Sequence, residues 1–213
     1  MTIVLIHGAA TAATVWRSLL DELGDLDEAV IAPQREYSGD WERELDALEP
    51  LCSEALVVGV SGGATLGLAL ALRGVPLRAA VLHEPAAGSL APHLLDDVAA
   101  AWRQNGVLGF GHALYGSSWG RELAPAEDDT VARDFSMFRA FEPLRPRHPL
   151  SQLVITVGEL SPPVRHESVA ALAELTGART ATVPGGRHAV HLDNVTAFAA
   201  VIRANAAMVK QKG

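Results

Sequence analysis

The chain of 213 residues has a single cysteine and no cluster of basic residues. Because one cysteine has no partner within the chain, Cys52 cannot form an intramolecular disulfide, and we expect it to be a buried free thiol. Acidic residues outnumber Lys and Arg by 25 to 17, which gives a formal net charge of −8. Nucleic acids and anionic membranes attract basic surfaces, so neither is an expected partner.

The N-terminal sequence MTIVLIHG has no basic segment ahead of its apolar run. An export signal begins with such a segment, so we expect no export signal and a cytoplasmic location. The chain also lacks internal repeats, low-complexity tracts and domain linkers. Its 49% hydrophobic and 20% charged residues are typical of a globular protein. We therefore expect a single domain over residues 1–213, with a substantial core.

Short β-branched runs alternate with helical patterns along the chain, and this alternation is typical of β-α-β units. It predicts an α/β fold with a mostly parallel six-stranded sheet and helices on both faces. Such sheets bind ligands beyond the carboxyl ends of their strands, so the residues that follow each strand are candidate site residues. The expected strands are Ile3–His7, Ala29–Ala32, Ala55–Val60, Ala79–His83, Leu153–Val157 and Thr180–Val183. The expected helices are residues 14–23, 41–48, 64–72, 165–175 and 195–208.

A long stretch between the fourth and fifth expected strands interrupts this alternation. We expect a helical cap insertion at about residues 86–150, with helices near 94–104 and 130–141. The stretch holds seven of the chain's eleven aromatic residues. These rings either line an apolar pocket over an active site or attach the insertion to the sheet, and we expect some rings to do each. They are Trp102, Phe110, Tyr115, Trp119, Phe135, Phe138 and Phe141.

The centre of the chain carries a G-x-S-x-G motif between an apolar strand and an apolar helix. The sequence ALVVGV runs into Gly59-Val60-Ser61-Gly62-Gly63, and ATLGLALAL follows. A nucleophile elbow needs this strand–turn–helix context, which predicts that Ser61 is the nucleophile of an acyl-transfer enzyme. The alternative is an ordinary Gly/Ser turn. The eighteen residues 55–72 carry no charge, which is near the length of a membrane span, but strand, turn and helix explain the clustered glycines better.

The loop after the first strand is a candidate for part of an oxyanion hole. The sequence there is Ile6-His7-Gly8-Ala9-Ala10, and small residues suit a loop whose backbone N–H groups face a site. Acyl transfer needs two such donors for the developing oxyanion. One is expected from Gly62, which follows the nucleophile, and the other from Ala9 in preference to Ala10. The alternative is a simple strand-to-helix turn.

A glycine-rich loop after the last strand presents a candidate general base. It reads PGGRHAVH over residues 184–191, and it places His188 ahead of the final helix. Neutral imidazole is suited to accepting the Ser61 proton and returning it to a leaving group. His191 forms an H-x-x-H pair with His188, but two histidines without a third ligand are weak evidence for a metal, and we expect no metal site.

These motifs, in this order, resemble those of the α/β-hydrolase fold superfamily. They are HG at 7–8, GVSGG at 59–63 and PGGRH at 184–188, and the segment REYSGD at 35–40 falls where many members carry an Arg-Gly turn. The resemblance spans nearly the whole chain and is to compact members, such as small esterases, hydroxynitrile lyases and lactone-hydrolysing relatives. It implies Ser61 as nucleophile, His188 as base and Gly62 with Ala9 as oxyanion donors, without a cofactor.

The sequence departs from the superfamily at the acid that orients the base. The usual G-x-x-D turn reads Gly158-Glu159-Leu160-Ser161, so a serine stands where aspartate is expected. A serine can orient an imidazole, but it cannot supply the charge that stabilises imidazolium. Glu84, which follows the fourth strand, is the favoured substitute and Glu159 is the second candidate. A weakened dyad of Ser61 and His188 is the third alternative.

Three hypotheses for function follow from these residues. The first is a serine hydrolase that cleaves a small apolar ester, thioester or lactone through a Ser61–His188–Glu84 triad, with an apolar acyl or aryl group bound by the insertion. The second is a lyase or cyclase of the same fold, which uses Ser61 and His188 only for proton transfer. The third is a protein that binds a small hydrophobic ligand without turning it over.

Overall fold

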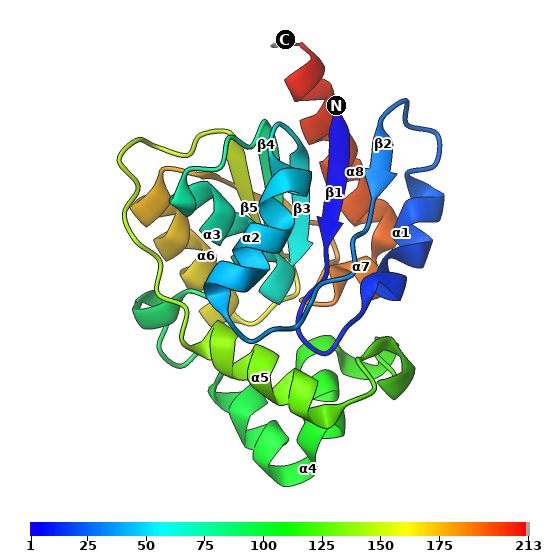
Figure 1. Cartoon of the computed structure of the whole chain (residues 1–213), viewed down its shortest axis with the longest axis vertical. Helices are drawn as coiled ribbons and strands as arrows, with labels where there is room; N and C mark the ends of the chain where they lie inside the picture. The colour runs from blue at the N-terminus through cyan, green and yellow to red at the C-terminus, as the bar shows by residue number, and fades with distance from the viewer. Residues whose placement is uncertain (212–213) are drawn as a thin grey trace.

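A six-stranded, fully parallel sheet forms the centre of the computed structural model, which describes residues 1–211 (Figure 1). The strands lie in the order β2-β1-β3-β4-β5-β6. Each begins and ends within one residue of its predicted range, so the predicted α/β fold class is confirmed. The strands are β1 (Thr2–Ile6), β2 (Ala29–Ile31), β3 (Leu56–Val60), β4 (Ala79–His83), β5 (Leu153–Gly158) and β6 (Arg179–Val183).

Alternate residues of a strand point to opposite sides of the sheet, so the sheet has two apolar faces. A different set of helices covers each face. In β1, Ile3 and Leu5 belong to one apolar cluster, and Val4 and Ile6 belong to the other. Helices pack on both clusters, which is why the inner strands are continuous hydrophobic runs. The first face is covered by η1 (Ala13–Trp16), α1 (Arg17–Glu22), α7 (Val190–Asp193) and α8 (Val195–Lys210). The second face is covered by α2 (Trp41–Cys52), α3 (Gly62–Arg73) and α6 (Pro163–Thr176).

The uncharged stretch at residues 55–72 divides at Ser61 into β3 and α3. Nearly all of its residues are buried inside the fold, which accounts for the lack of charge. Among residues 1–211, no helix combines the length and the apolar character needed to cross a bilayer.

Helix α2 extends four residues beyond its predicted end and includes Pro50. The missing N–H of Pro50 removes one hydrogen bond near the end of the helix, and the last turn persists. The extension brings Cys52 into the core, where it is a buried free thiol, as expected. Burial raises the pKa of this thiol to about 12.

The chain between β4 and β5 forms a helical insertion beyond the carboxyl ends of the strands (Figure 1). Its first long helix, α4, consists of two helical segments, and the first of them ends at residue 104, as predicted. Asn105 and Gly106 have non-helical backbone angles, with Gly106 at φ +52°, and a second segment that was not predicted continues to Tyr115. The elements are η2 (Gly88–Leu90), α4 (Asp96–Tyr115), η3 (Gly116–Ser118), η4 (Arg121–Leu123) and α5 (Asp128–Arg139).

Aromatic residues of the insertion pack both with one another and with the rest of the protein. The rings of Phe110 and Phe135 lie 4.6 Å apart between α4 and α5. Trp41 of α2 contacts Phe138 and Phe141, with centroid distances of 5.8 and 5.3 Å. The contacts of Trp41 attach α5 to the helix layer that covers the second face of the sheet.

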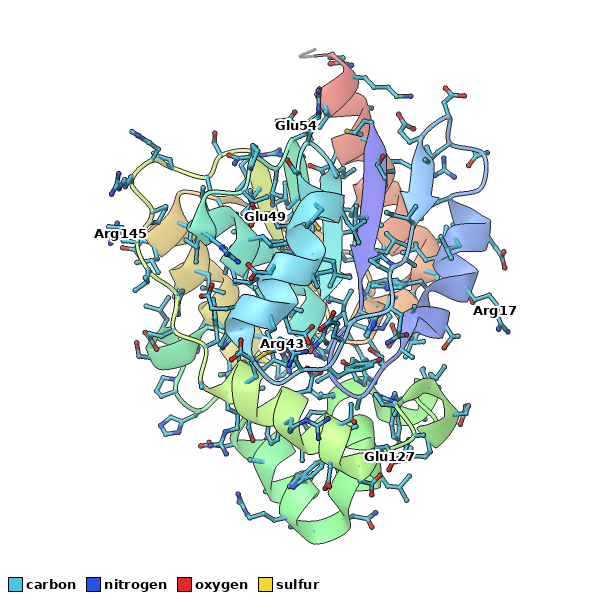
Figure 2. All side chains as sticks on the ribbon, in the orientation of Figure 1. Arg17, Arg43, Glu49, Glu54, Glu127 and Arg145 are labelled. Carbon is cyan, nitrogen blue, oxygen red and sulfur yellow. The ribbon has the colours of Figure 1, made fainter. Side chains whose placement is uncertain are left out.

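Most charged side chains are at least partly exposed, and Glu28, just before β2, is one of the few buried ones away from the carboxyl ends of the strands. Figure 2 shows Arg17 and Arg145 projecting from opposite sides of the molecule. The buried charged residues described below are therefore exceptions to the general distribution of charge in this protein.

Candidate active site

The turn between β3 and α3 holds Ser61 in a strained backbone conformation. Its φ and ψ are +56° and −121°, values that residues other than glycine rarely adopt. The flanking glycines are needed for space. A Cβ on Gly59 would lie 2.5 Å from the backbone of Gly63, and a Cβ on Gly63 would lie 1.8 Å from the carbonyl oxygen of Ile6. The N–H of Ser61 donates to the carbonyl of His83 at 2.9 Å, which ties this turn to the end of β4.

His188 and Glu84 form a buried hydrogen-bonded pair. His188 lies in the loop after β6, and Glu84 directly follows β4, so both come from the carboxyl end of the sheet. The distance from Nδ1 of His188 to Oε2 of Glu84 is 2.8 Å. Glu159, the second candidate acid, points elsewhere, since its Oε2 accepts the N–H of Gly185 at 2.7 Å. The structure therefore brings Glu84, and not Glu159, to the imidazole.

Three groups donate hydrogen bonds to the carboxylate of Glu84, and Arg165 forms an ion pair with it. Its Oε1 accepts the N–H of Gly158 at 3.0 Å and the hydroxyl of Ser161. Its Oε2 accepts Nδ1 of His188 and also contacts Nε of Arg165 at 3.1 Å. Burial acts to raise the pKa of Glu84, but the hydrogen bond from His188 and nearby positive charge, including that of Arg165, hold it well below its usual range. Ser161 thus holds the acid in place from the position where aspartate is usual.

His188 is neutral at pH 7 in this environment. Its pKa is lowered to about 4, mainly by burial and also by the positive charge of Arg165. The hydrogen bond to Glu84 raises the pKa but does not offset these effects. Since Nδ1 donates to Glu84, Nε2 is the acceptor nitrogen of the ring. Nε2 has no hydrogen-bond partner among residues 1–211, so Ser61 and His188 are not hydrogen-bonded in this state. Such bonds often tighten only when substrate binds.

Tyr115, the last residue of α4, lies against both His188 and the loop after β1. Its ring stacks on the imidazole of His188, with centroids 5.6 Å apart and planes 19° apart. Its hydroxyl donates to the carbonyl of Ala9 at 2.8 Å. A Cβ on Gly8 would lie 2.6 Å from this hydroxyl oxygen and 3.1 Å from Cβ of Ser61. Gly8 therefore leaves the space in which the two side chains approach each other.

Ala9 and Gly62 line the same cavity as Ser61. Gly62 is the first residue of α3, and N–H groups in a first helical turn lack intrahelical acceptors. Ala9 is 3% exposed, in the loop after β1. Within residues 1–211 neither N–H donates a backbone hydrogen bond. The two predicted oxyanion donors thus line the cavity of Ser61 without engaging their N–H groups in backbone hydrogen bonds.

The cavity beside Ser61 is small and mostly apolar. It has a volume of about 20 Å³, and the insertion contributes Phe110, Phe135 and Phe138 to its wall. A larger cavity of about 450 Å³ lies on the His188 side. Arg165 borders both cavities, as do three apolar residues of the insertion, Leu94, Val98 and Leu114.

Arg35 links the segment after β2 to the insertion through buried ion pairs. Its Nε contacts Glu44 of α2 at 3.2 Å, and its Nη1 contacts Asp134 of α5 at 3.1 Å. All three side chains are at most 1% exposed. Nη1 also donates to the carbonyl of Gly8 at 3.4 Å. Arg35 therefore joins α2, α5 and the loop after β1 at one point.

Sequence analysis did not identify Arg165, Arg35 or Tyr115 as site residues. The only signal for Arg165 is its place soon after β5, where ligands of parallel sheets bind. The partner of Arg35 is Asp134, 99 residues away in sequence, and no pattern connects them. Tyr115 is one of seven aromatic residues in the insertion, and only the fold distinguishes it from the others.

The H-x-x-H pair does not form part of a metal centre in the structure. The ring of His191 packs against Trp16, with centroids 5.1 Å apart, and lies edge-on to Tyr115. In the described part of the chain, no group of three or more His, Cys, Asp or Glu side chains is placed to hold a metal ion.

Comparisons with known proteins agree with this architecture. The structure is similar to a thermophilic esterase from Thermogutta terrifontis, with 18% identity, a TM-score of 0.70 and coverage of 98% of this chain and 90% of that one. It is similar to the enol-lactonase from Burkholderia xenovorans LB400, with 19% identity, a TM-score of 0.69 and coverage of 97% and 91%. A thioesterase from the prodiginine biosynthetic pathway in Streptomyces coelicolor is 22% identical, with a TM-score of 0.65 and coverage of 99% and 89%.

At these identities the structural likeness establishes the fold alone. No curated protein matches the sequence. The model of the alpha/beta hydrolase family matches residues 3–201, which is most of the chain. Together with the strand order and the turn at Ser61, this match shows that the protein belongs to the alpha/beta hydrolase family.

Proposed function

We propose that the protein is a serine hydrolase that cleaves a small ester, thioester or lactone with an apolar acyl or aryl group. The observation that carries the proposal is the 2.8 Å hydrogen bond between His188 and Glu84 at the same end of the sheet as the strained turn of Ser61. A base oriented by a carboxylate beside an activated serine is the arrangement that acyl transfer requires.

In the proposed mechanism, the hydroxyl of Ser61 attacks the substrate carbonyl and Nε2 of His188 accepts its proton. Glu84 keeps the Nδ1 tautomer of His188 and stabilises the imidazolium. The N–H groups of Ala9 and Gly62 receive the negative charge that forms on the carbonyl oxygen. His188 then returns the proton to the leaving group, and the acyl group stays on Ser61. Water attacks the acyl-enzyme with His188 again as base, which releases the acid and restores Ser61.

The apolar lining of the cavity beside Ser61 favours an apolar acyl or aryl group, and the cavity, at about 20 Å³, must widen to admit one. Three phenylalanine rings of the insertion and several aliphatic side chains line it. Burial of such a group in this cavity would contribute about 25 cal/mol per Å² of apolar surface. We therefore propose that the insertion, residues 86–150, acts as a cap that forms the acyl pocket, and we call it the cap below. The reaction as written needs no cofactor.

The hypothesis of a lyase or cyclase arises from the missing aspartate at position 161. Glu84 supplies a carboxylate to the imidazole, so the missing aspartate no longer argues for a lyase or cyclase. The esterase, enol-lactonase and thioesterase among the similar structures, although distant, are compatible with hydrolysis.

A fluorophosphonate probe tests the proposal directly. We expect intact-mass analysis to show one adduct, peptide mapping to place it on Ser61, and Ser61→Ala to remove it. Turnover of an activated aryl ester with a burst of product would identify the acyl-enzyme. An unlabelled wild-type protein over a broad pH range would contradict the proposal. If Ser61→Ala also kept ligand binding and biological activity, the protein would be a binding module.

A further inference from the structure

The loop after β1 is held by side chains that bind its carbonyl groups one after another. The carbonyl of Gly8 accepts the Thr11 hydroxyl at 3.0 Å and Nη1 of Arg35 at 3.4 Å. The carbonyl of Ala9 accepts the Tyr115 hydroxyl at 2.8 Å. The next two carbonyls, of Ala10 and Thr11, accept Nε1 of Trp119 at 2.8 Å and the Tyr37 hydroxyl at 2.7 Å. We call residues 8–11 the oxyanion loop.

These bonds determine where the N–H groups of the oxyanion loop point. A peptide group is planar and trans, so its N–H points opposite to its carbonyl. Holding the Gly8 carbonyl therefore orients the N–H of Ala9, and holding the Ala9 carbonyl orients the N–H of Ala10. Ala10 has φ of +52°, which alanine rarely adopts without support from its surroundings. The conformation of the loop thus depends on these side-chain donors.

Several of the supporting groups belong to the cap. Tyr115 ends α4, and Trp119 follows η3. Trp119 is itself fixed, because its ring lies against Gly111 so closely that a Cβ there would be 2.4 Å away. A third contact joins the N–H of Ala12 to the carbonyl of Leu123 at 2.7 Å, just after the loop. One of the two bonds to the Gly8 carbonyl comes from Arg35, which the cap residue Asp134 holds.

We propose that the cap positions the oxyanion loop, and that Tyr115 is the positioning residue that joins this loop to His188. The inference rests on the proposed function, because only an acyl-transfer reaction uses these N–H groups. It adds a role for the cap beyond forming the acyl pocket. The Tyr115 hydroxyl holds the loop while its ring stacks on the base, so one side chain fixes both the electrostatic and the proton-transfer parts of the site. Burial raises the pKa of Tyr115, which keeps the hydroxyl protonated as a donor.

The test compares Tyr115→Phe and Trp119→Phe with Trp102→Phe. Trp102 lies in the same cap and packs against Phe110, but it makes no hydrogen bond to the oxyanion loop within residues 1–211. We would measure kcat and KM for an activated aryl ester, the Kd of an arylboronic acid that forms a tetrahedral adduct on serine, and the Tm. The boronic acid reports on the oxyanion hole, whereas KM reports mainly on the acyl pocket.

We expect Tyr115→Phe to lower kcat about tenfold, because a buried carbonyl loses its donor and the loop relaxes. In the same variant the boronic acid Kd should rise by a similar factor, while KM stays within about twofold of wild type. Trp102→Phe should keep the wild-type kcat, KM and Kd. Trp119→Phe should shift kcat and Kd in the same direction. Unchanged kcat in Tyr115→Phe, or reduced kcat with an unchanged boronic acid Kd, would overturn the inference. A wild-type protein that fluorophosphonate does not label would instead refute the proposed function.

Discussion

Replacing Glu84 by Gln should lower activity and stability through two separate contacts. The carboxylate carries the charge that stabilises a protonated His188, and similar replacements in triads lower kcat by about 10⁴-fold. The same carboxylate is the only acidic group in contact with Arg165 among the described residues, and the Arg165 side chain is 9% exposed. Leaving a buried cation without its partner typically costs about 3–5 kcal/mol. Urea unfolding followed by circular dichroism, with kcat for an aryl ester, measures both effects.

A second substitution separates the two contributions. Arg165→Met in the Glu84→Gln background removes the unpaired cation, so we expect much of the lost stability to return. Activity should stay low, because His188 still lacks a carboxylate. Glu159→Gln is the matched control, since Glu159 is exposed and, among residues 1–211, bonds only the N–H of Gly185. The reasoning fails if Glu84→Gln keeps wild-type kcat, or if the double variant unfolds at the same urea concentration as Glu84→Gln.

Three other predictions follow from the structure. Because burial lowers the pKa of His188 to about 4, kcat/KM should stay level as pH falls through 6.5 and decline only near pH 4, and a decline centred at 6.5 would contradict this. Arg35→Met leaves two buried carboxylates unpaired and should cost about 3–5 kcal/mol in urea unfolding, whereas Arg73→Met on the surface should change the midpoint little. Gly63→Ala places a Cβ 1.8 Å from the carbonyl oxygen of Ile6, so we expect loss of soluble expression or of fluorophosphonate labelling. A soluble variant with normal labelling would refute the close contact between Gly63 and Ile6.

The strands and the turn at Ser61 could be predicted because their causes are local. A buried parallel strand needs an apolar run of a few residues, and a sharp turn needs glycine where a Cβ has no room. Both requirements appear as residue types at fixed spacing, for example in Leu56–Val60 and in Gly59 and Gly63. Helix ends were less predictable. Helix α2 runs four residues past its predicted end, and the half of α4 that follows the break at Asn105-Gly106 was not predicted.

The acid illustrates what remained open in the sequence. Glu84 and Glu159 both follow strands of the sheet, and residue type alone does not tell which carboxylate faces the imidazole. The choice depends on side-chain direction. Glu84 has φ of +48°, and its side chain lies toward His188. The Ser161 hydroxyl and the N–H of Gly158 donate hydrogen bonds to its carboxylate.

The sequence by itself determined the sheet, the order of the motifs and the identity of the serine and histidine candidates, because each depends on near neighbours in the chain. The tertiary structure alone decided the contacts of Glu84 with Arg165, of Arg35 with Asp134 and of Tyr115 with Ala9. These pairs lie from tens to about a hundred residues apart. Their formation depends on how the insertion settles on the sheet, which is a property of three-dimensional packing and leaves no periodic pattern in the chain.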